Sequence, residues 1–423
     1  TLSTRNRETT NHFGMKRSNM SDVISTIALF SIFLRWWLYW EAVFCVPVGR
    51  YLIHLSEVVV SAGVILLVLR GQLRSLRFAK FTIFAGFYLL LQGFSGTLFR
   101  SEYRVLDILI GAWYILLPFA FISVLPSKSL PLLRKLTTIT LGWFTFQVLV
   151  GATGLLNHLS PSLVYDVYAG IWRVNNTLGG PTGGAHIAFC LLIVFLETSR
   201  VKSVWRDMLL VGTFLALLLT ASRSVWLQVG LLLIYLSYMA LRSIRGVKKA
   251  ILYALFVGAM STILWGNIIF PFFYERMNKS GAQISDLQRL DKINWALDVV
   301  ASENLLFFGT GIGTAFLRSW VPVGTKPLLK GFLLFEEGGN YYLGAPHNTY
   351  LVLVSEIGIL GMLLLATLFV RFVYPEIKQS SLVVFGVLIV LCTTLATETI
   401  LLFPDAGYAF AFLIWSGSLH TVS

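Results

Sequence analysis

The chain has 423 residues, of which 56% are hydrophobic and only 13% are charged. Its mean hydropathy is +0.76. A soluble chain of this length could bury a large core, but this composition is typical of a protein whose solvent is lipid. It predicts a polytopic helical membrane protein. The formal net charge of +13 leaves nucleic-acid binding as an alternative, which depends on where the cations lie.

Twelve apolar segments follow one another along the chain, each close to the ~20 residues that a bilayer core requires. They cover residues 22–40, 51–69, 79–96, 105–125, 132–155, 183–198, 205–220, 223–241, 249–269, 347–371, 380–398 and 402–418. We therefore expect an all-α fold of about twelve transmembrane helices.

These segments divide the chain into five parts. They are a cytoplasmic tail over 1–21, helices one to nine over 22–269, a large polar loop over 270–346, helices ten to twelve over 347–418 and a cytoplasmic tail over 419–423. Residues 1–14 are polar and precede Met15, and we expect a disordered tail or an over-extended translation start. We expect the functional site to lie at the large loop.

Positive charges gather in alternate connections between the predicted spans. The clusters are Arg5, Arg7, Lys16 and Arg17; Arg70, Arg74, Arg77 and Lys80; Lys128, Arg134 and Lys135; Arg200, Lys202 and Arg206; Arg242, Arg245, Lys248 and Lys249; Arg371 and Lys378. Since cytoplasmic loops carry the excess of Lys and Arg, this alternation places both termini in the cytoplasm and the 270–346 loop in the periplasm. Because the positive charges follow alternate connections between spans, they also argue against a nucleic-acid partner.

The large loop is predicted to contain a helix and a tight turn. Ser285 and Gln288 have capping-box spacing, and apolar residues recur at helical intervals at Leu287, Leu290, Ile293, Leu297 and Val300. The later Gly309-Thr-Gly311-Ile-Gly313 motif lacks the strand and helix of a dinucleotide-binding unit. We expect it to turn the chain back to the membrane.

Three cysteines, Cys45, Cys190 and Cys392, fall in or beside apolar spans without paired spacing. They predict neither a disulfide framework nor a zinc site. We expect no metal and no other cofactor.

Several polar residues mark the expected outer ends of spans. Arg173 lies in IWRVNNTLGGPTGGAHIAF, Arg223 lies at a very short turn between spans seven and eight, Arg289 stands on the loop helix, and His347 begins span ten beside Asn348. Snorkelling explains many interfacial arginines. Together, Arg223, Arg289 and His347 would put two fixed cations and one titratable base at one membrane face. This combination suits a diphosphate on a lipid carrier, because arginine binds phosphate bidentately.

The ionisable residues inside predicted spans include Arg35, Glu57, Asp107 and Glu356. Each costs about 2.5–3.5 kcal/mol on insertion scales if it is unpaired at a helix centre. Arg35 and Glu57 sit at similar depths toward the outer ends of spans one and two, so we expect them to form an ion pair.

Four sequence blocks then occur in a recognisable order: NNTLGGPTGGAHIAF, TASRSVWL, RLDKINWALDVVASENLLFFGTGIGTAF and GAPHNTYLVLVSEIGILGMLLL. With them, the chain resembles the O-antigen ligase and polysaccharide polymerase superfamily of bacterial membrane glycosyltransferases over roughly residues 170–370. The resemblance implies metal-independent transfer of a glycan from an undecaprenyl diphosphate donor to an acceptor hydroxyl, at the outer face of the cytoplasmic membrane.

The resemblance also implies roles for single residues. Arg223 and Arg289 match the family's diphosphate-binding arginines, and His347 matches the histidine associated with acceptor activation. Arg173 and Gly184 fit the polymerases' spacing of an arginine, ten residues and a glycine, and Asn348 is a further candidate for substrate binding. The implied partners are the lipid-linked donor, a glycan or lipid A core acceptor, membrane lipid and, for a polymerase, a chain-length regulator.

The chemistry is coherent without the family. Transfer from a lipid diphosphate creates negative charge on the leaving phosphate, which preorganised cations stabilise. A histidine titrates near neutral pH and can take the acceptor proton.

Alternative functions remain open. A ligase uses lipid A core as acceptor and a polymerase uses another undecaprenyl-linked chain; we take the ligase-like function as the first hypothesis. A twelve-span transporter or flippase predicts charges along the midplane and two pseudo-symmetric halves, whereas the ionisable residues here gather toward the outer side. A non-catalytic scaffold gives no reason for Arg223, Arg289 and His347 to occur together.

Overall fold

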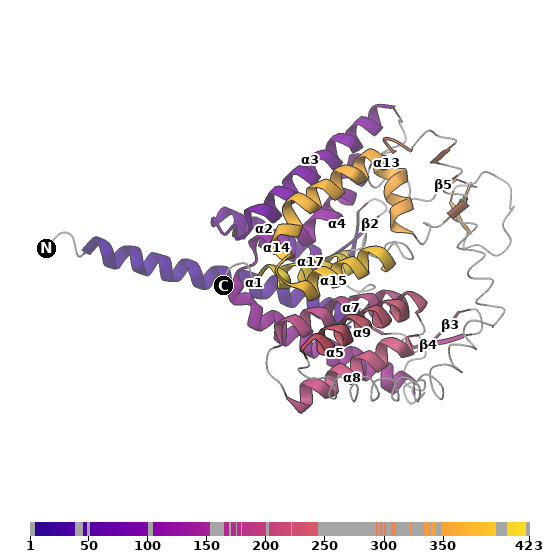
Figure 1. Ribbon diagram of the computed structural model, residues 1–423. Coiled ribbons are helices and arrows are strands. Elements are labelled where there is room, and N and C mark those ends of the chain that lie inside the picture. The colour runs from indigo at the N-terminus through magenta and orange to yellow at the C-terminus, as the bar shows by residue number, and fades with distance from the viewer. Residues whose placement is uncertain are drawn as a thin grey trace.

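The computed structural model describes a helical bundle with short β-hairpins beside it (Figure 1). The described residues are 5–38, 45–48, 51–99, 105–152, 165–168, 171–174, 176–178, 180–199, 203–220, 222–243, 293–294, 297, 300–301, 306–309, 311, 321–322, 334–337, 340–343, 348–394 and 404–419.

Long helices form the bundle. They are α1 (Arg5–Leu38), α2 (Leu55–Leu69), α3 (Leu76–Phe99), α4 (Val105–Val124), α5 (Leu130–Ala152), α7 (Gly180–Thr198), α8 (Val204–Leu219), α9 (Arg223–Ser243), α13 (Thr349–Leu368), α15 (Ser381–Ile389) and α17 (Pro404–Ser418). Shorter helical pieces are η1 (Ser127–Ser129), α14 (Tyr374–Ile377) and the π-helical turns η3 (Phe369–Val373) and η4 (Val390–Thr394). Every predicted span overlaps a helix except 249–269, which lies outside the described residues; the first four residues of the span 51–69 form a strand instead. The prediction of a helical fold is confirmed.

The short strands were not predicted from the sequence. β1 (Cys45–Val48) pairs with β2 (Tyr51–His54), and β3 (Tyr165–Tyr168) pairs with β4 (Ile171–Val174). β7 (Asn340–Leu343) lies between β5 (Val321–Pro322) and β6 (Leu334–Glu337). All pairs are antiparallel, and each strand is too short to show the alternation that identifies a strand in a sequence.

The core lies around α7 and α17, which pack against each other. Nearly all side chains from Ala185 to Phe195 and from Ala406 to Trp415 are buried, as expected for helices that are hydrophobic on every side. The outer helices leave large apolar side chains exposed, among them Ile83, Phe84 and Phe87 on α3, Met208 and Val211 on α8, and Leu360 and Leu363 on α13. Apolar surface of this extent is unfavourable in water and favourable in lipid.

Two helical segments among the described residues, Met20–Leu38 and Thr349–Ile377, are long and apolar enough to cross a bilayer. Ile108–Val124 and Ser127–Ala152 are bent by 101° and add a third if they form one span. Further apolar helices are shorter: Leu55–Leu69, Thr182–Thr198 and Ser381–Thr394. The count of twelve spans and the position of the large loop stay predictions.

Ion pairs place connections between helices at two opposite ends of the bundle. At one end, Arg77 forms an ion pair with Glu376 at 3.0 Å, joining two connections that were assigned to the same face. At the other, Arg35 pairs with Glu57 at 3.0 Å and with Asp405 at 2.6 Å. These ion pairs agree with the predicted assignment of alternate connections to opposite membrane faces. Which end of the bundle faces the cytoplasm stays a prediction.

The N-terminal residues from Arg5 onward are helical, whereas a disordered tail was one of the two expectations for residues 1–14; the other, an over-extended translation start, stays a prediction. α1 begins at Arg5 and projects from the bundle as one continuous helix (Figure 1). Extending an existing helix is far easier than nucleating a new one, and the chain from Arg5 to Leu38 contains no proline to stop it.

Candidate functional site

The structure describes the predicted site residues unequally. Arg223 is the first residue of α9 and is half-buried. Asn348 is the N-cap of α13, and its side-chain oxygen accepts a hydrogen bond from the Leu351 N–H at 3.0 Å. Arg173 lies in β4 opposite Asp166, and its side chain is not described. Arg289 and His347 lie outside the described residues, so their approach to Arg223 stays a prediction.

A rigid turn places Arg223 at the start of α9. The Trp226 indole N–H donates to the Leu218 carbonyl at 2.7 Å and thereby ties the first turn of α9 to the last turn of α8. The Trp226 backbone N–H donates to the Ser222 carbonyl at 3.0 Å. Because the connection between α8 and α9 is so short, the first residue of α9 has little freedom to move. The predicted location of Arg223 on a very short turn is confirmed.

A cluster of uncharged polar side chains is buried beside this turn. We call it the His186 cluster: His186 of α7, Ser224 and Gln228 of α9, and Thr393 and Thr394 of η4. His186 Nδ1 lies 3.0 Å from Gln228 Oε1, and His186 Nε2 lies 3.2 Å from Ser224 Oγ. Gln228 Nε2 donates to Thr393 Oγ1 at 2.9 Å and to Thr394 Oγ1. The imidazole is 3% exposed and the amide 0%.

The hydrogen-bond pattern assigns the tautomer of His186. Both N–H donors of the Gln228 amide go to threonine hydroxyls, so Gln228 Oε1 is left to accept. A proton on His186 Nδ1 fits this acceptor, with Thr394 Oγ1 also 3.3 Å from Nδ1. With the proton there, a neutral ring would accept from Ser224 through Nε2.

The cluster reaches both neighbours of Arg223. Ser224 follows it in the sequence and bonds to His186, while Ser222 precedes it and lies 3.1 Å from Ser224, Oγ to Oγ. Three helical elements, α7, α9 and η4, thus converge on this point of the chain. Sequence reasoning missed His186 and Gln228 because it considered only charged residues within spans. Uncharged polar residues in apolar helices were the available signal.

Gly184 has a structural explanation. Asn176 is 2% exposed, and its side-chain oxygen accepts from the Leu178 N–H at 3.1 Å. A Cβ at Gly184 would collide with the Asn176 amide. The glycine that completes the spacing with Arg173 is therefore required for packing, whatever role Arg173 has.

The glycine motif of the large loop docks on a break in α13. Gly309 and Gly311 have positive φ of 67° and 111°, and the Gly311 N–H donates to the Glu356 carbonyl at 2.7 Å. Gly358 interrupts α13 with φ 68°. The sequence predicted a turn that brings the chain back to the membrane. The contact between Gly311 and α13 confirms this prediction.

No side chain fits at this junction. A Cβ on Gly309 would meet the backbone of Glu356, and a Cβ on Gly358 would meet the backbone of Phe307. The Gln92 amide of α3 donates to the Phe308 carbonyl at 2.6 Å and to the Glu356 carbonyl at 2.8 Å. Backbone groups freed by the helix break are thus satisfied by the loop and by α3.

The loop helix is also supported in part. The described positions 293–294, 297 and 300–301 are helical; Val300 is buried, whereas Leu297 is 50% exposed.

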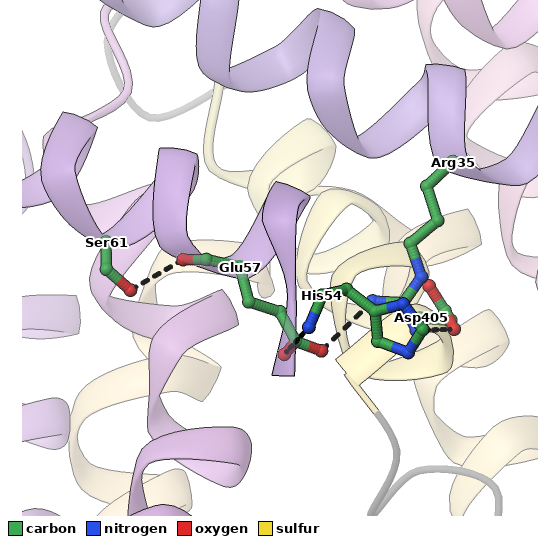
Figure 2. A network of polar contacts seen from close by, with 5 residues as sticks. All are labelled: Arg35, His54, Glu57, Ser61 and Asp405. Carbon is green, nitrogen blue, oxygen red and sulfur yellow. Dashed lines mark hydrogen bonds and ion pairs between the residues drawn. The ribbon is translucent and has the colours of Figure 1, made fainter. Parts of the chain in front are cut away.

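A charged network of Arg35, Glu57 and Asp405, which we call the Arg35 network, joins α1, α2 and α17 (Figure 2). Arg35 donates to Glu57 Oε1 at 3.0 Å and to Asp405 Oδ2 at 2.6 Å. The second oxygen of Glu57 accepts from the His54 backbone N–H at 3.1 Å, at the start of α2. The predicted Arg35–Glu57 pair is confirmed. Asp405 is an additional partner, which no local pattern indicated.

Comparison with known proteins adds an independent result. Residues 208–366 match the family model described as O-antigen ligase. The matched segment contains Arg223, Arg289 and His347. Searches of curated proteins and of solved structures returned no match. The match covers less than half of the chain and supports the similarity of residues 208–366 to the O-antigen ligase and polymerase superfamily.

Proposed function

We propose that the protein transfers a glycan from undecaprenyl diphosphate to an acceptor hydroxyl at the outer face of the cytoplasmic membrane. The proposed acceptor is lipid A core, as in an O-antigen ligase. The observation that carries the proposal is the family match, because it covers Arg223, Arg289 and His347 in one segment.

In the proposed reaction, the bond between the anomeric carbon and the diphosphate oxygen breaks, and a bond to the acceptor oxygen forms. Negative charge develops on the leaving diphosphate. Arg223 and Arg289 would bind this group through their planar guanidinium forks and stabilise the charge. His347 would accept the proton of the attacking hydroxyl.

The surroundings of Arg223 support its part in this reaction. The residue opens α9, where backbone N–H groups and the helix dipole also favour an anion. The hydrogen bonds to Ser222, Ser224 and Trp226 hold the turn in one geometry. A cation fixed before the substrate arrives needs no reorganisation during the reaction.

Transfer by the purified protein from a synthetic undecaprenyl diphosphate donor tests the proposal. With chelator present, we expect Arg223→Lys and Arg289→Lys to lose ~10²–10³ in rate, because lysine keeps the charge but lacks the fork. His347→Ala should lose ~10²–10⁴. Arg242→Lys is the matched control, because Arg242 is exposed in the last turn of the same helix.

Two results would contradict this mechanism. Wild-type rates in both lysine variants would remove the arginines from diphosphate binding. Complete loss of transfer with chelator alone would show that a metal is required.

The acceptor is decided in the same assay. Supplying lipid A core in one reaction and a second undecaprenyl-linked glycan in another distinguishes ligase from polymerase by the product formed. The spacing of Arg173 and Gly184 does not favour a polymerase by itself, since packing against Asn176 already requires the glycine.

A further inference from the structure

A basic pocket lies at the end of the bundle opposite the Arg35 network. Its volume is about 540 Å³, and it lies between the start of α3 and the η3–α14 segment. Its charged lining consists of Arg74, Arg77, Lys80, Arg371 and Glu376. Two connections far apart in the sequence contribute cations to one space.

The cations outnumber the carboxylate. Glu376 is 15% exposed and pairs with Arg77 at 3.0 Å. Within the described part of the chain, no carboxylate forms an ion pair with Arg74, Lys80 or Arg371. Four cations against one carboxylate make the pocket favourable for an anion.

Arg74 is held in place rather than mobile in solvent. Its guanidinium lies over the Trp415 ring, 5.4 Å from the centroid, and its backbone N–H donates to the Ser123 carbonyl at 2.9 Å. Its Nη1 is buried and has no hydrogen-bond partner among the described residues. Burial lowers the pKa of Arg74, and Glu376 opposes that shift. A desolvated, oriented guanidinium gains more from an anion than one in water does.

Apolar side chains share the pocket wall. Leu76 lines the pocket and is 58% exposed, and Phe372 lines it beside Arg371. The ligand suited to this wall has an anionic group and an adjoining apolar part. A phospholipid has both, whereas free phosphate has only the first.

We propose that this pocket binds the phosphate headgroup of an anionic phospholipid at the membrane interface. Basic pockets between the ends of membrane helices suit such headgroups. The site is separate from the residues of the proposed glycosyl transfer, so its occupancy is measured without an activity assay.

Native mass spectrometry of the full chain in detergent tests this inference. Phosphatidylglycerol should stay bound at collision energies that remove phosphatidylcholine. Each cation is worth about 1 kcal/mol toward an anionic surface, so Arg371→Gln and Lys80→Gln should each weaken phosphatidylglycerol binding on the order of fivefold. Lys80 is exposed, which makes its substitution safe for folding.

Lys135→Gln is the matched control: this exposed lysine lies in the first turns of α5, on a connection assigned to the same face, and outside the pocket. The Lys135→Gln variant should bind phosphatidylglycerol as strongly as the wild type does. The inference fails if phosphatidylcholine is retained equally, if Lys135→Gln weakens binding as much as Arg371→Gln, or if millimolar inorganic phosphate displaces the lipid completely. The last result would identify a site for free phosphate.

Discussion

The Arg35 network and the His186 cluster both join three helical elements through buried or half-buried polar groups, but only the first is charged. Arg35, Glu57 and Asp405 connect α1, α2 and α17, which come from opposite ends of the chain. The His186 cluster connects α7, α9 and η4 through neutral donors and acceptors.

Because only the Arg35 network is charged, we expect mutations in the two groups to affect different properties of the protein. A buried charge that loses its partner is strongly destabilising, whereas an uncharged group loses only a hydrogen bond. The network lies away from Arg223 in the sequence, and the cluster includes the residue that follows it. We therefore expect changes in the network to lower protein stability and changes in the cluster to lower transfer at nearly normal abundance.

The largest effect is expected for Arg35→Met. Glu57 is fully buried, and removing its cation should lower the free energy of unfolding by about 3–5 kcal/mol. The melting temperature in detergent and the amount of protein in the membrane measure the loss. An unchanged melting temperature would show that the ion pair does not hold α1 against α2.

Tyr408→Phe is the control for that measurement. Tyr408 is 1% exposed in the same region, and its hydroxyl has no hydrogen-bond partner within the described residues. Removing a buried hydroxyl without a partner should leave stability unchanged or raise it.

An intermediate effect is expected for Gln228→Leu. The substitution deprives His186 Nδ1 and two threonine hydroxyls of a partner, at a cost of about 1–3 kcal/mol. Because a displacement of about 1 Å can cost ~10²-fold in rate, transfer should fall at least about tenfold while most of the protein remains folded. Rates measured per folded protein separate the two effects. If the rate per folded molecule is that of the wild type, the cluster serves stability alone.

The smallest effect is expected for Ser224→Ala. It removes one hydrogen bond to His186, worth about 1 kcal/mol, and should lower transfer more than it lowers stability. Ser416→Ala is the comparison, because the Ser416 hydroxyl is also buried but donates to the Leu413 carbonyl of its own helix at 2.7 Å. Equal losses of transfer in both variants would contradict a specific role for the turn.

The sequence predicted what local chemistry determines. Apolar length located the helices, the depth of Arg35 and Glu57 predicted their ion pair, and the glycines at 309 and 311 predicted a turn. It could not predict Asp405 as a partner or the meeting of His186 with Gln228, because both depend on how distant helices pack. The short strands were missed because strands of two to four residues carry no readable pattern. The roles of Arg289 and His347 rest on the family match and await the transfer assay.

The docking of Gly311 at the break around Gly358 has a consequence for the segment that follows it. Gly311 contacts α13 through the Glu356 carbonyl, and the chain reaches the same helix again at its N-cap, Asn348. Both ends of the intervening segment are thus held on one helix, so we expect its length to affect the bundle little: doubling a flexible loop costs only about 0.6 kcal/mol. Insertions within residues 312–346 should therefore leave the helices in place, whereas His347, the proposed base, has to keep its position next to the N-cap of α13.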